Sequence, residues 1–360
     1  MIFFRKYLIK IIFSIVLILF LVLSPFVIFA KIKELNYSLN LENDVENSKI
    51  LTLLNVDTFE GGSFSRSGFL EKRAIEFEKK YKGIYIIVKN VSLNQLNSIL
   101  ISNNKPNIIT FGIGVEEAFL DKIVELENFG VREDLVLGGK SGSKIMAVPI
   151  MLGGYTLISN KEKVANEIII QSLSDGSTKL GFSSNESISP LVSMLKNEYK
   201  IAKQEVESMD SFSAYDKFIN GKVDVLLGTQ RDYYRCKNRE KNLKMQCNYE
   251  ILGGFSDLIQ YASVFKTNEV EEKYSKEFIK FLTIEENQQK LESISMFPVI
   301  NKNIYKDEDY KIFNKVLLEN IKTINVFTKN STIDEIKQSA KDYVFNETSD
   351  KKFVEKQFAR

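Results

Sequence analysis

Short apolar runs alternate with helix-like segments along most of this chain, and that alternation constrains its fold more than any other feature. Strands are predicted at Ile50–Val56, Ile84–Val91 and Asn107–Phe111. Between the first two strands, apolar residues recur at helical spacing from Leu70 to Tyr81. Strands that alternate with helices in this way form mainly parallel sheets with helices on both faces. The pattern therefore predicts an α/β fold.

The chain has 360 residues, more than one hydrophobic core usually accommodates, so two lobes are expected. A candidate connection between them is Gly153-Gly154, which separates the apolar runs 145–152 and 155–160. Tyr155 follows directly, and we expect it to lie where the two lobes meet.

The composition excludes several classes of function. The chain has no histidine, which removes Ser-His and Cys-His nucleophile pairs, histidine metal sites and histidine general bases. The net charge of +2 gives no basic field for a nucleic acid. Neither a metal site nor a cofactor is expected, and an enzyme would have to work with Asp, Glu, Lys, Tyr or Ser alone. Because tryptophan is absent as well, stacking on a ligand would fall to tyrosine and phenylalanine.

Cys236 and Cys247 are the only cysteines. In an exported protein they could close a small disulfide loop around Lys237–Gln246, and two free buried thiols are the alternative. We favour the disulfide because the segment between the cysteines is highly charged and is not expected to form a core.

The N-terminal segment predicts export. Met1–Lys10 is a short basic head, and Ile11–Ala30 is apolar over a length that suffices to span a bilayer. We expect the head to stay in the cytoplasm and the rest to lie outside it. An uncleaved signal-anchor is preferred to a signal peptide cleaved after Ala30. No cysteine follows the apolar segment, so a lipid anchor on cysteine is excluded, and residues 31–48 are interpreted as a tether.

A candidate recognition edge lies within Phe218–Arg235. A helix-like pattern ends at Gly221, a short apolar strand follows, and after Gly228 the chain turns polar and aromatic. Ligands of open α/β sheets lie beyond the carboxyl ends of the strands. The residues in that position are Thr229, Gln230, Arg231, Asp232 and Tyr233. The alternative is an ordinary solvated turn with a surface ion pair.

A second candidate edge is the glycine- and serine-rich loop 57–68, which follows the first strand and offers backbone N–H groups to a polar ligand. Its glycines match neither a dinucleotide fingerprint nor a phosphate-binding loop. Glu60 and Arg66 are its candidate ligand contacts, and the alternative is that they only order the loop.

Taken in order, these pieces resemble bacterial extracellular solute-binding proteins of family 1, the sugar-binding class of ABC importers. The resemblance covers nearly all of the chain from Ile50 to about Lys302. The segments that carry it are Asn55–Leu70, Pro106–Gly112, Ala147–Asn160, Phe218–Asp232 and Asn287–Val299.

The resemblance implies a periplasmic-binding-protein type II fold, with two α/β lobes, a hinge and a ligand cleft between the lobes. By that analogy lobe 1 holds residues 50–112 and 255–302, and lobe 2 holds residues 113–254 and 303–360. The sequence departs from the family twice. The usual lipobox cysteine is missing, and so are the tryptophans of many oligosaccharide binders, which argues against a long sugar.

The implied function is reversible capture of a small solute, with a carbohydrate as the expected class, and its delivery to ABC permease subunits outside the cytoplasm. Closing the hinge would complete the contacts. Charged side chains would bind ligand hydroxyls, and aromatic rings would cover apolar faces. The candidate ligand-binding residues are Glu60, Arg66, Gly112, Tyr155, Thr229, Gln230, Arg231, Asp232, Tyr233, Phe255 and Asp257. The alternatives are an ion pair of Arg231 with Asp232 that fixes the strand end, and Tyr233 in a lobe core.

Two other classes of function stay open. One is a membrane-tethered ligand-sensing module. A sensor needs a cytoplasmic output domain, and only about ten residues precede the apolar segment, so it would work with a partner signalling chain. The other is an anchored hydrolase with a carboxylate pair, Asp57 with Glu60 or Asp232 with Asp257.

Overall fold

The computed structural model describes residues 48–59, 65–101, 106–117, 119–164, 169–183, 187–202, 209–242 and 245–359. Residues Ile50–Arg360 form one compact unit. The predicted anchor Ile11–Ala30 and the tether, apart from Ser48, lie outside the described residues. Within the part of the chain that is described, no helix is long and apolar enough to cross a membrane.

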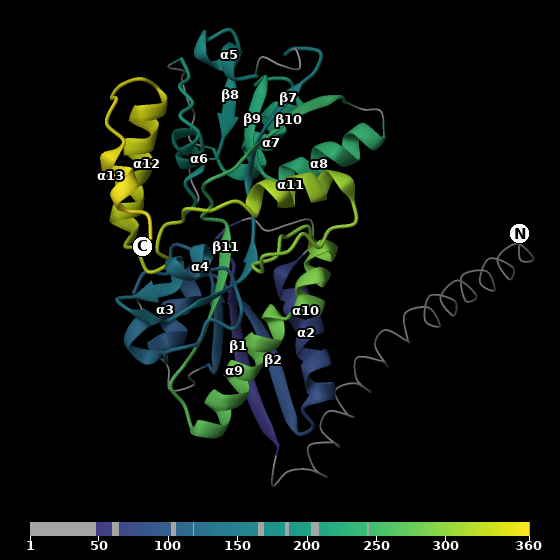
Figure 1. Ribbon diagram of the computed structural model, residues 1–360, viewed down its shortest axis with the longest axis vertical. Coiled ribbons are helices and arrows are strands. Elements are labelled where there is room, and N and C mark those ends of the chain that lie inside the picture. Colours follow the sequence, from purple (N-terminus) through teal and green to yellow (C-terminus); the bar gives the residue numbers. More distant parts are fainter. Residues whose placement is uncertain are drawn as a thin grey trace, which may run out of the picture. The chain divides into compact units, whose positions relative to one another are not determined.

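A five-stranded sheet forms the first lobe, with strand order β2-β1-β3-β11-β6 (Figure 1). Its strands are β1 (Lys49–Val56), β2 (Ile84–Val91), β3 (Ile108–Phe111), β6 (Val148–Leu152) and β11 (Ile259–Val264). Strands β1 and β3 are parallel, with Leu53 opposite Ile108, whereas β11 is antiparallel to both β3 and β6. Its helices are α2 (Arg66–Lys80), α3 (Leu93–Ile101), α4 (Glu133–Val136), α9 (Glu269–Thr283) and α10 (Glu285–Gln289).

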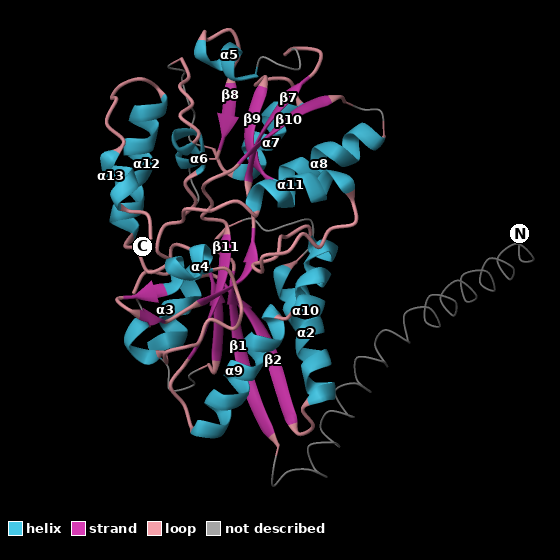
Figure 2. Cartoon of the chain, in the orientation of Figure 1, coloured by secondary structure: helices cyan, strands magenta, loops and turns pink. Residues whose placement is uncertain are grey.

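A four-stranded sheet forms the second lobe, with strand order β10-β7-β9-β8 (Figure 2). Its strands are β7 (Tyr155–Asn160), β8 (Leu180–Phe182), β9 (Val225–Thr229) and β10 (Cys247–Leu252). Its helices are α5 (Ile169–Ser174), α6 (Pro190–Lys196), α7 (Ser211–Ile219) and α8 (Gln230–Lys241). Only β8 and β9 pair in parallel here, since β7 runs antiparallel to both β9 and β10. The predicted α/β class is confirmed, but both sheets are mixed rather than mainly parallel.

The chain passes between the sheets at Gly153-Gly154 and again between β10 and β11. The N–H of Gly153 donates to the carbonyl of Leu258 at 2.6 Å, which ties the two passages together. A Cβ on Gly154 would lie 2.7 Å from the ring of Phe313, so only glycine fits there. Strand β6 precedes this step and pairs within the first sheet. The predicted boundary at residue 113 is therefore displaced, and residues 148–152 lie in the first lobe.

The C-terminal part consists of α11 (Glu308–Leu317), α12 (Asn330–Val344) and α13 (Lys352–Lys356). Helix α12 packs against α6 of the second lobe (Figure 1, yellow). The segment between α11 and α12 is not helical and is bound to the first lobe. There the guanidinium of Arg132 donates to the carbonyls of Leu317 and Glu319, and the N–H of Val326 donates to the carbonyl of Gly138. A small hairpin of β4 (Lys140–Ser141) and β5 (Lys144–Ile145) lies nearby in the sequence.

Cys236 and Cys247 are free and buried in the structure. They belong to a small core beside β9, together with Ile158, Phe218 and Leu226. Hydrogen bonding to Cys247 and burial both raise the pKa of the Cys236 thiol. As predicted, no described residue of the charged segment Lys237–Gln246 is buried. The cysteines themselves are buried, and the amphipathic helix α8 turns Cys236 inward. The disulfide itself stays a prediction.

Candidate functional site

The predicted recognition edge after β9 is the start of a helix. Thr229 caps α8: its hydroxyl accepts from the N–H of Arg231 at 3.3 Å, and the carboxylate of Asp232 accepts from the N–H of Thr229 at 3.0 Å. Asp232 is buried and also contacts Arg235 at 3.4 Å. The carboxylate of Asp232 therefore stabilises the first turn of α8. Arg231, in the same turn, is half-buried.

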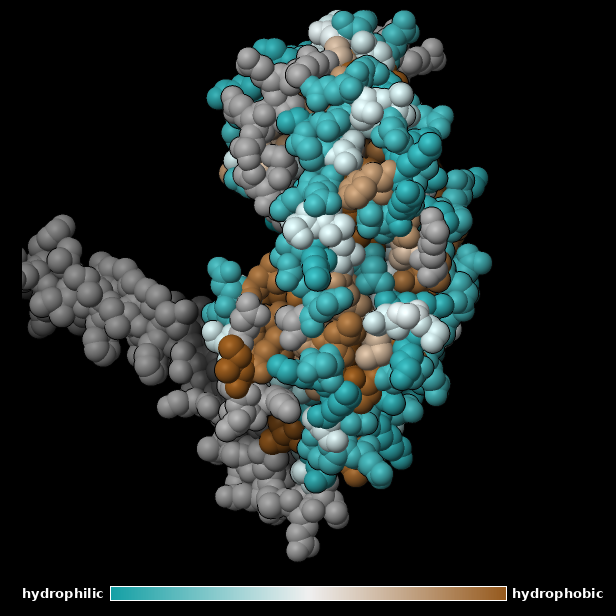
Figure 3. Space-filling model, turned by 90° about the vertical axis from the view of Figure 1, so that its left-hand side faces the viewer, coloured by the Kyte–Doolittle hydropathy of each residue, from teal (hydrophilic) through white to brown (hydrophobic). Residues whose placement is uncertain are grey.

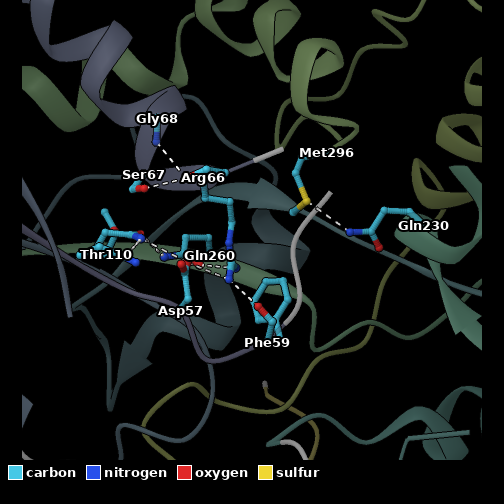
Figure 4. Close-up of polar contacts among 12 residues, drawn as sticks. Asp57, Phe59, Arg66, Ser67, Gly68, Thr110, Gln230, Gln260 and Met296 are labelled. Atoms are coloured by element: carbon cyan, nitrogen blue, oxygen red, sulfur yellow. Dashed lines mark hydrogen bonds and ion pairs between the residues drawn. The ribbon is translucent and has the colours of Figure 1, made fainter. Parts of the chain in front are cut away.

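Two further residues of this edge are buried in protein contacts. Gln230 accepts from the N–H of Gly154 at 3.0 Å and donates to the sulfur of Met296 at 3.2 Å (Figure 4). It thereby holds α8 to the passage between the lobes. The ring of Tyr233 packs edge-on against Tyr249 and Phe313, which is the core position that the sequence left as its alternative.

Arg66 lies at the centre of a polar network in the first lobe (Figure 4). Its guanidinium donates to the side-chain oxygen of Gln260 at 2.7 Å and to the carbonyl of Phe59 at 2.5 Å, and it pairs with Asp57 at 2.9 Å. The same group lies 4.2 Å from the centre of the Phe59 ring. Burial lowers the pKa of Arg66, and the Asp57 carboxylate partly offsets that effect.

The network continues into the sheet, where Gln260 donates to the side-chain oxygen of Asn55 at 3.1 Å. That oxygen also accepts from the hydroxyl of Thr110 at 2.9 Å. Strands β1, β3 and β11 are therefore joined to the loop that follows β1. In this arrangement Arg66 fixes the loop.

Gly112 lies under the same loop at the end of β3. A Cβ at this position would overlap the hydroxyl of Thr58 and approach the ring of Phe59 to 3.0 Å. The Thr58 hydroxyl is buried and has no hydrogen-bond partner among the described residues. Glu60, the other predicted contact of this loop, lies outside the described residues. Gly112 thus allows the loop to lie directly on the sheet end.

Asp257 joins three segments where the lobes meet. Its carboxylate accepts from the hydroxyl of Tyr155 at 2.5 Å and from the N–H of Ser189 at 2.7 Å. The carboxylate is fully buried, and burial raises its pKa, while these two donors and the charge of Lys337 act in the opposite direction. Phe255 lies parallel to Tyr155 with ring centres 6.4 Å apart.

A cavity of about 300 Å³ opens beside this junction, between the segment that leads into α6 and the helix α12. Its lining residues are Phe182, Ser183, Ile188, Ser189, Pro190, Leu191, Val192, Asp334, Lys337, Gln338, Ala340 and Lys341. The wall formed by residues 182–192 is mostly apolar, and α12 contributes all of the charged lining residues. A smaller neighbouring cavity shares Ser183 and Ile188 and extends to Tyr155, Thr229 and Asp232.

The first lobe contacts the segments on both sides of the large cavity, near its lining residues. A Cβ on Gly114 would lie 2.6 Å from the hydroxyl of Ser187, in the segment before α6. The N–H of Asn330, the first residue of α12, donates to the carboxylate of Glu116 at 2.9 Å. Figure 3 shows that the surface is hollowed between the upper and lower parts of the molecule, with apolar side chains on the lower side of the hollow.

The structure brings part of the predicted site together. Tyr155, Thr229 and Asp232 line the smaller cavity, and Asp257 reaches the larger one through Ser189. The α12 wall is absent from the residues that the sequence predicts. The polar stripe Asp334, Lys337, Gln338 and Lys341 recurs at helical spacing and could have been noticed, but its position in the fold could not.

No family model and no curated protein matches the sequence. Solved structures match over most of the chain. Maltose-bound MalE3 of T. maritima is 14% identical, covers 85% of this chain and 97% of its own, and superposes with a TM-score of 0.58. The cyclic α-maltosyl-1,6-maltose-binding protein of Arthrobacter globiformis is 11% identical, with 86% and 96% covered and a TM-score of 0.61. The GacH receptor of Streptomyces glaucescens, solved unliganded and with acarbose, is 14% identical, with 86% and 97% covered and a TM-score of 0.58.

The chain has the fold of these binding proteins. The expectation of a solute-binding-protein fold is thereby confirmed. The sequence identity of 11–14% is too low to assign the ligands of these proteins to this chain.

Proposed function

We propose that this chain captures a small carbohydrate where its two lobes meet and delivers it, unaltered and outside the cytoplasm, to an ABC permease. The observation that carries the proposal is the cavity between α6 and α12, which lies near contacts of both segments with the first lobe. Ser187, before α6, lies against Gly114, and Asn330, the first residue of α12, is bound to Glu116. Solved proteins of the same fold are described as binding maltose, acarbose or cyclic maltosyl-maltose.

The size and lining of the cavity support a short sugar. Its volume of about 300 Å³ lies at the lower end of the range of about 300–1,000 Å³ for small-molecule sites. Amide and charged groups of α12 stand opposite the wall that holds Leu191, Val192 and the hydroxyl of Ser189, an arrangement that suits the polar edge and the apolar face of one or two sugar rings. Phe182 is the one aromatic residue in the lining, which fits the absence of tryptophan.

Hinge closure would complete the site. Separating the lobes would break the hydrogen bond from Asn330 to Glu116 and the contact of Gly114 with Ser187. Because these contacts hold the segments on both sides of the cavity, lobe movement would change the shape of the cavity, and a ligand that fits the closed shape would favour the closed arrangement. In this proposal Arg66 and Gly112 position the first-lobe loop. Arg231 and Glu60 are kept as ligand contacts to be tested.

The proposal is for binding without chemistry. Asp232 caps α8, and Asp257 is engaged by Tyr155 and Ser189, so this carboxylate pair of the hydrolase alternative is occupied within the protein. The predicted signal-anchor would hold the chain at the membrane near its permease, and this part of the proposal rests on the sequence alone.

The test measures thermal stabilisation of the purified protein by mono- and disaccharides, including maltose. A ligand that binds only the folded state raises the melting temperature progressively with concentration. Ser189→Ala removes a buried hydroxyl that has no partner among the described residues, so it should weaken binding and leave the unliganded melting temperature unchanged. Ser331→Ala, which is exposed on α12 and is not a lining residue of the cavity, is the control. If no saccharide shifts the melting temperature, or if the sugar is recovered altered, the proposal fails.

A further inference from the structure

The polar stripe on α12 is richer in positive than in negative charge where it faces the cavity. Lys337 and Lys341 are four residues apart, so they are neighbours on one helix face, where like charges repel each other. Asp334, at the N-terminal end of the stripe, is exposed. The wall thus offers two ammonium groups and one carboxylate to whatever occupies the cavity.

The positive charge of this wall is only partly balanced by the protein. Lys341 is exposed, and no ion pair of its side chain is found within the described part of the chain. Lys337 is half-buried and lies close enough to Asp257 to lower the pKa of that carboxyl. Asp257, however, is fully buried and already accepts from Tyr155 and Ser189, and burial favours its neutral form.

The opposite wall supplies a donor of its own. The hydroxyl of Ser189 is buried, lines the cavity, and has no hydrogen-bond partner among the described residues. A buried hydroxyl without a partner is unfavourable in the empty protein, and a ligand oxygen would satisfy it. Ser189 is therefore an observation independent of α12, and it indicates a ligand that carries a hydrogen-bonding oxygen.

Resting on the proposed function, we infer that the cavity selects a small saccharide that carries a carboxylate, a hexuronate or a short uronate-containing sugar. The ammonium group of Lys341 binds the carboxylate by a charge-assisted hydrogen bond, and the charge of Lys337 adds to the attraction. The sugar ring lies along the apolar wall at Leu191, and one of its oxygens accepts from Ser189. A neutral hexose of the same shape brings no anion to Lys341, and it binds more weakly.

The experiment uses the full-length protein and isothermal titration calorimetry with matched probes. D-glucuronate and D-galacturonate are compared with glucose and galactose, and each uronate disaccharide is compared with its neutral counterpart. Lys341→Gln should reduce uronate affinity about tenfold or more and reduce neutral-sugar affinity much less, because glutamine still offers a hydrogen bond to a sugar hydroxyl but no charge to a carboxylate. Lys352→Gln makes the same change of charge on exposed α13, away from the cavity, and should alter neither affinity. Uronate affinity should fall as salt is raised, because screening weakens the charge interaction.

The outcomes separate this inference from the proposed function. If neutral sugars bind and uronates do not, the inference is wrong and the proposed capture of a sugar is unaffected. The inference is overturned in the same way if uronates bind and Lys341→Gln together with Lys337→Gln does not weaken them. If neither kind of sugar binds, both the inference and the proposed function fail.

Discussion

Arg66→Lys is the perturbation that best tests how the first-lobe loop is held. Lysine keeps the positive charge but has a single ammonium head in place of the planar fork of arginine. It can keep the pair with Asp57, and it cannot at the same time reach the side-chain oxygen of Gln260 and the carbonyl of Phe59, which Arg66 contacts at 2.7 and 2.5 Å. Two hydrogen bonds to a charged group are lost, and the oxygen of Gln260 is left buried.

The magnitude follows from those contacts. Hydrogen bonds to charged groups contribute about 1.5–3 kcal/mol each, so losing two should lower the free energy of unfolding by about 3 kcal/mol or more. The Asp57 pair adds little to this figure, because the Asp57 side chain is 38% exposed and exposed pairs contribute about 0–1 kcal/mol. As a control, Arg235→Lys affects a side chain that is 21% exposed and contacts Asp232 at 3.4 Å, and it should cost less than about 1 kcal/mol.

Urea unfolding of the two variants and the parent gives the comparison. The midpoint should fall for Arg66→Lys at an unchanged slope, because an unchanged slope means that the surface exposed on unfolding is the same. An unchanged midpoint would refute the idea that this network stabilises the loop. If the midpoint stays and sugar affinity falls, Arg66 is a ligand contact, as the sequence predicted.

Two further predictions concern buried groups. Burial raises the pKa of Asp257 above its ordinary value of 3.8, so its contribution to stability is largest below that value and declines as the pH rises through the raised pKa. Asp257→Asn should remove this decline, and the variant should be at least as stable as the parent at pH 7. Urea unfolding between pH 4 and pH 7 measures the decline, and no histidine titrates in that range because the chain has none. A steeper decline in the variant would contradict the prediction. For Cys236 and Cys247 we expect a disulfide after export, so mass spectrometry after denaturing, non-reducing alkylation should find no label, whereas two labels would establish free thiols.

At the start of α8, two features of the sequence predict different structures. Thr229 and Asp232 are three residues apart, the spacing of a capping box, and such a pair directly after a strand predicts a helix. The polar and aromatic composition of the residues after Gly228 points instead to a solvated edge. Here the spacing of two residues is the better guide, because it reflects hydrogen bonds that form within one turn.

Other features depend on positions that the sequence does not relate. The α/β class and the passage at Gly153-Gly154 follow from apolar periodicity and glycine, which act over short distances. Gln260 is 194 residues from Arg66, and no periodicity connects them. The two walls of the cavity are likewise far apart in the chain. Partners of this kind are chosen by the packing of whole elements, so a single sequence names the candidate groups without pairing them.

Helix α12 contacts both lobes. Its first residue is bound to Glu116 of the first lobe, and its body packs on α6 of the second. The segment before it is bound to the first lobe at Arg132 and Gly138. A rotation of the lobes therefore has to move α12 relative to α6 or break its attachment at Asn330, and either change alters the cavity between the two helices. Binding of the proposed ligand in this cavity would therefore be coupled to lobe position through α12, and that coupling would need no residue in the hinge itself.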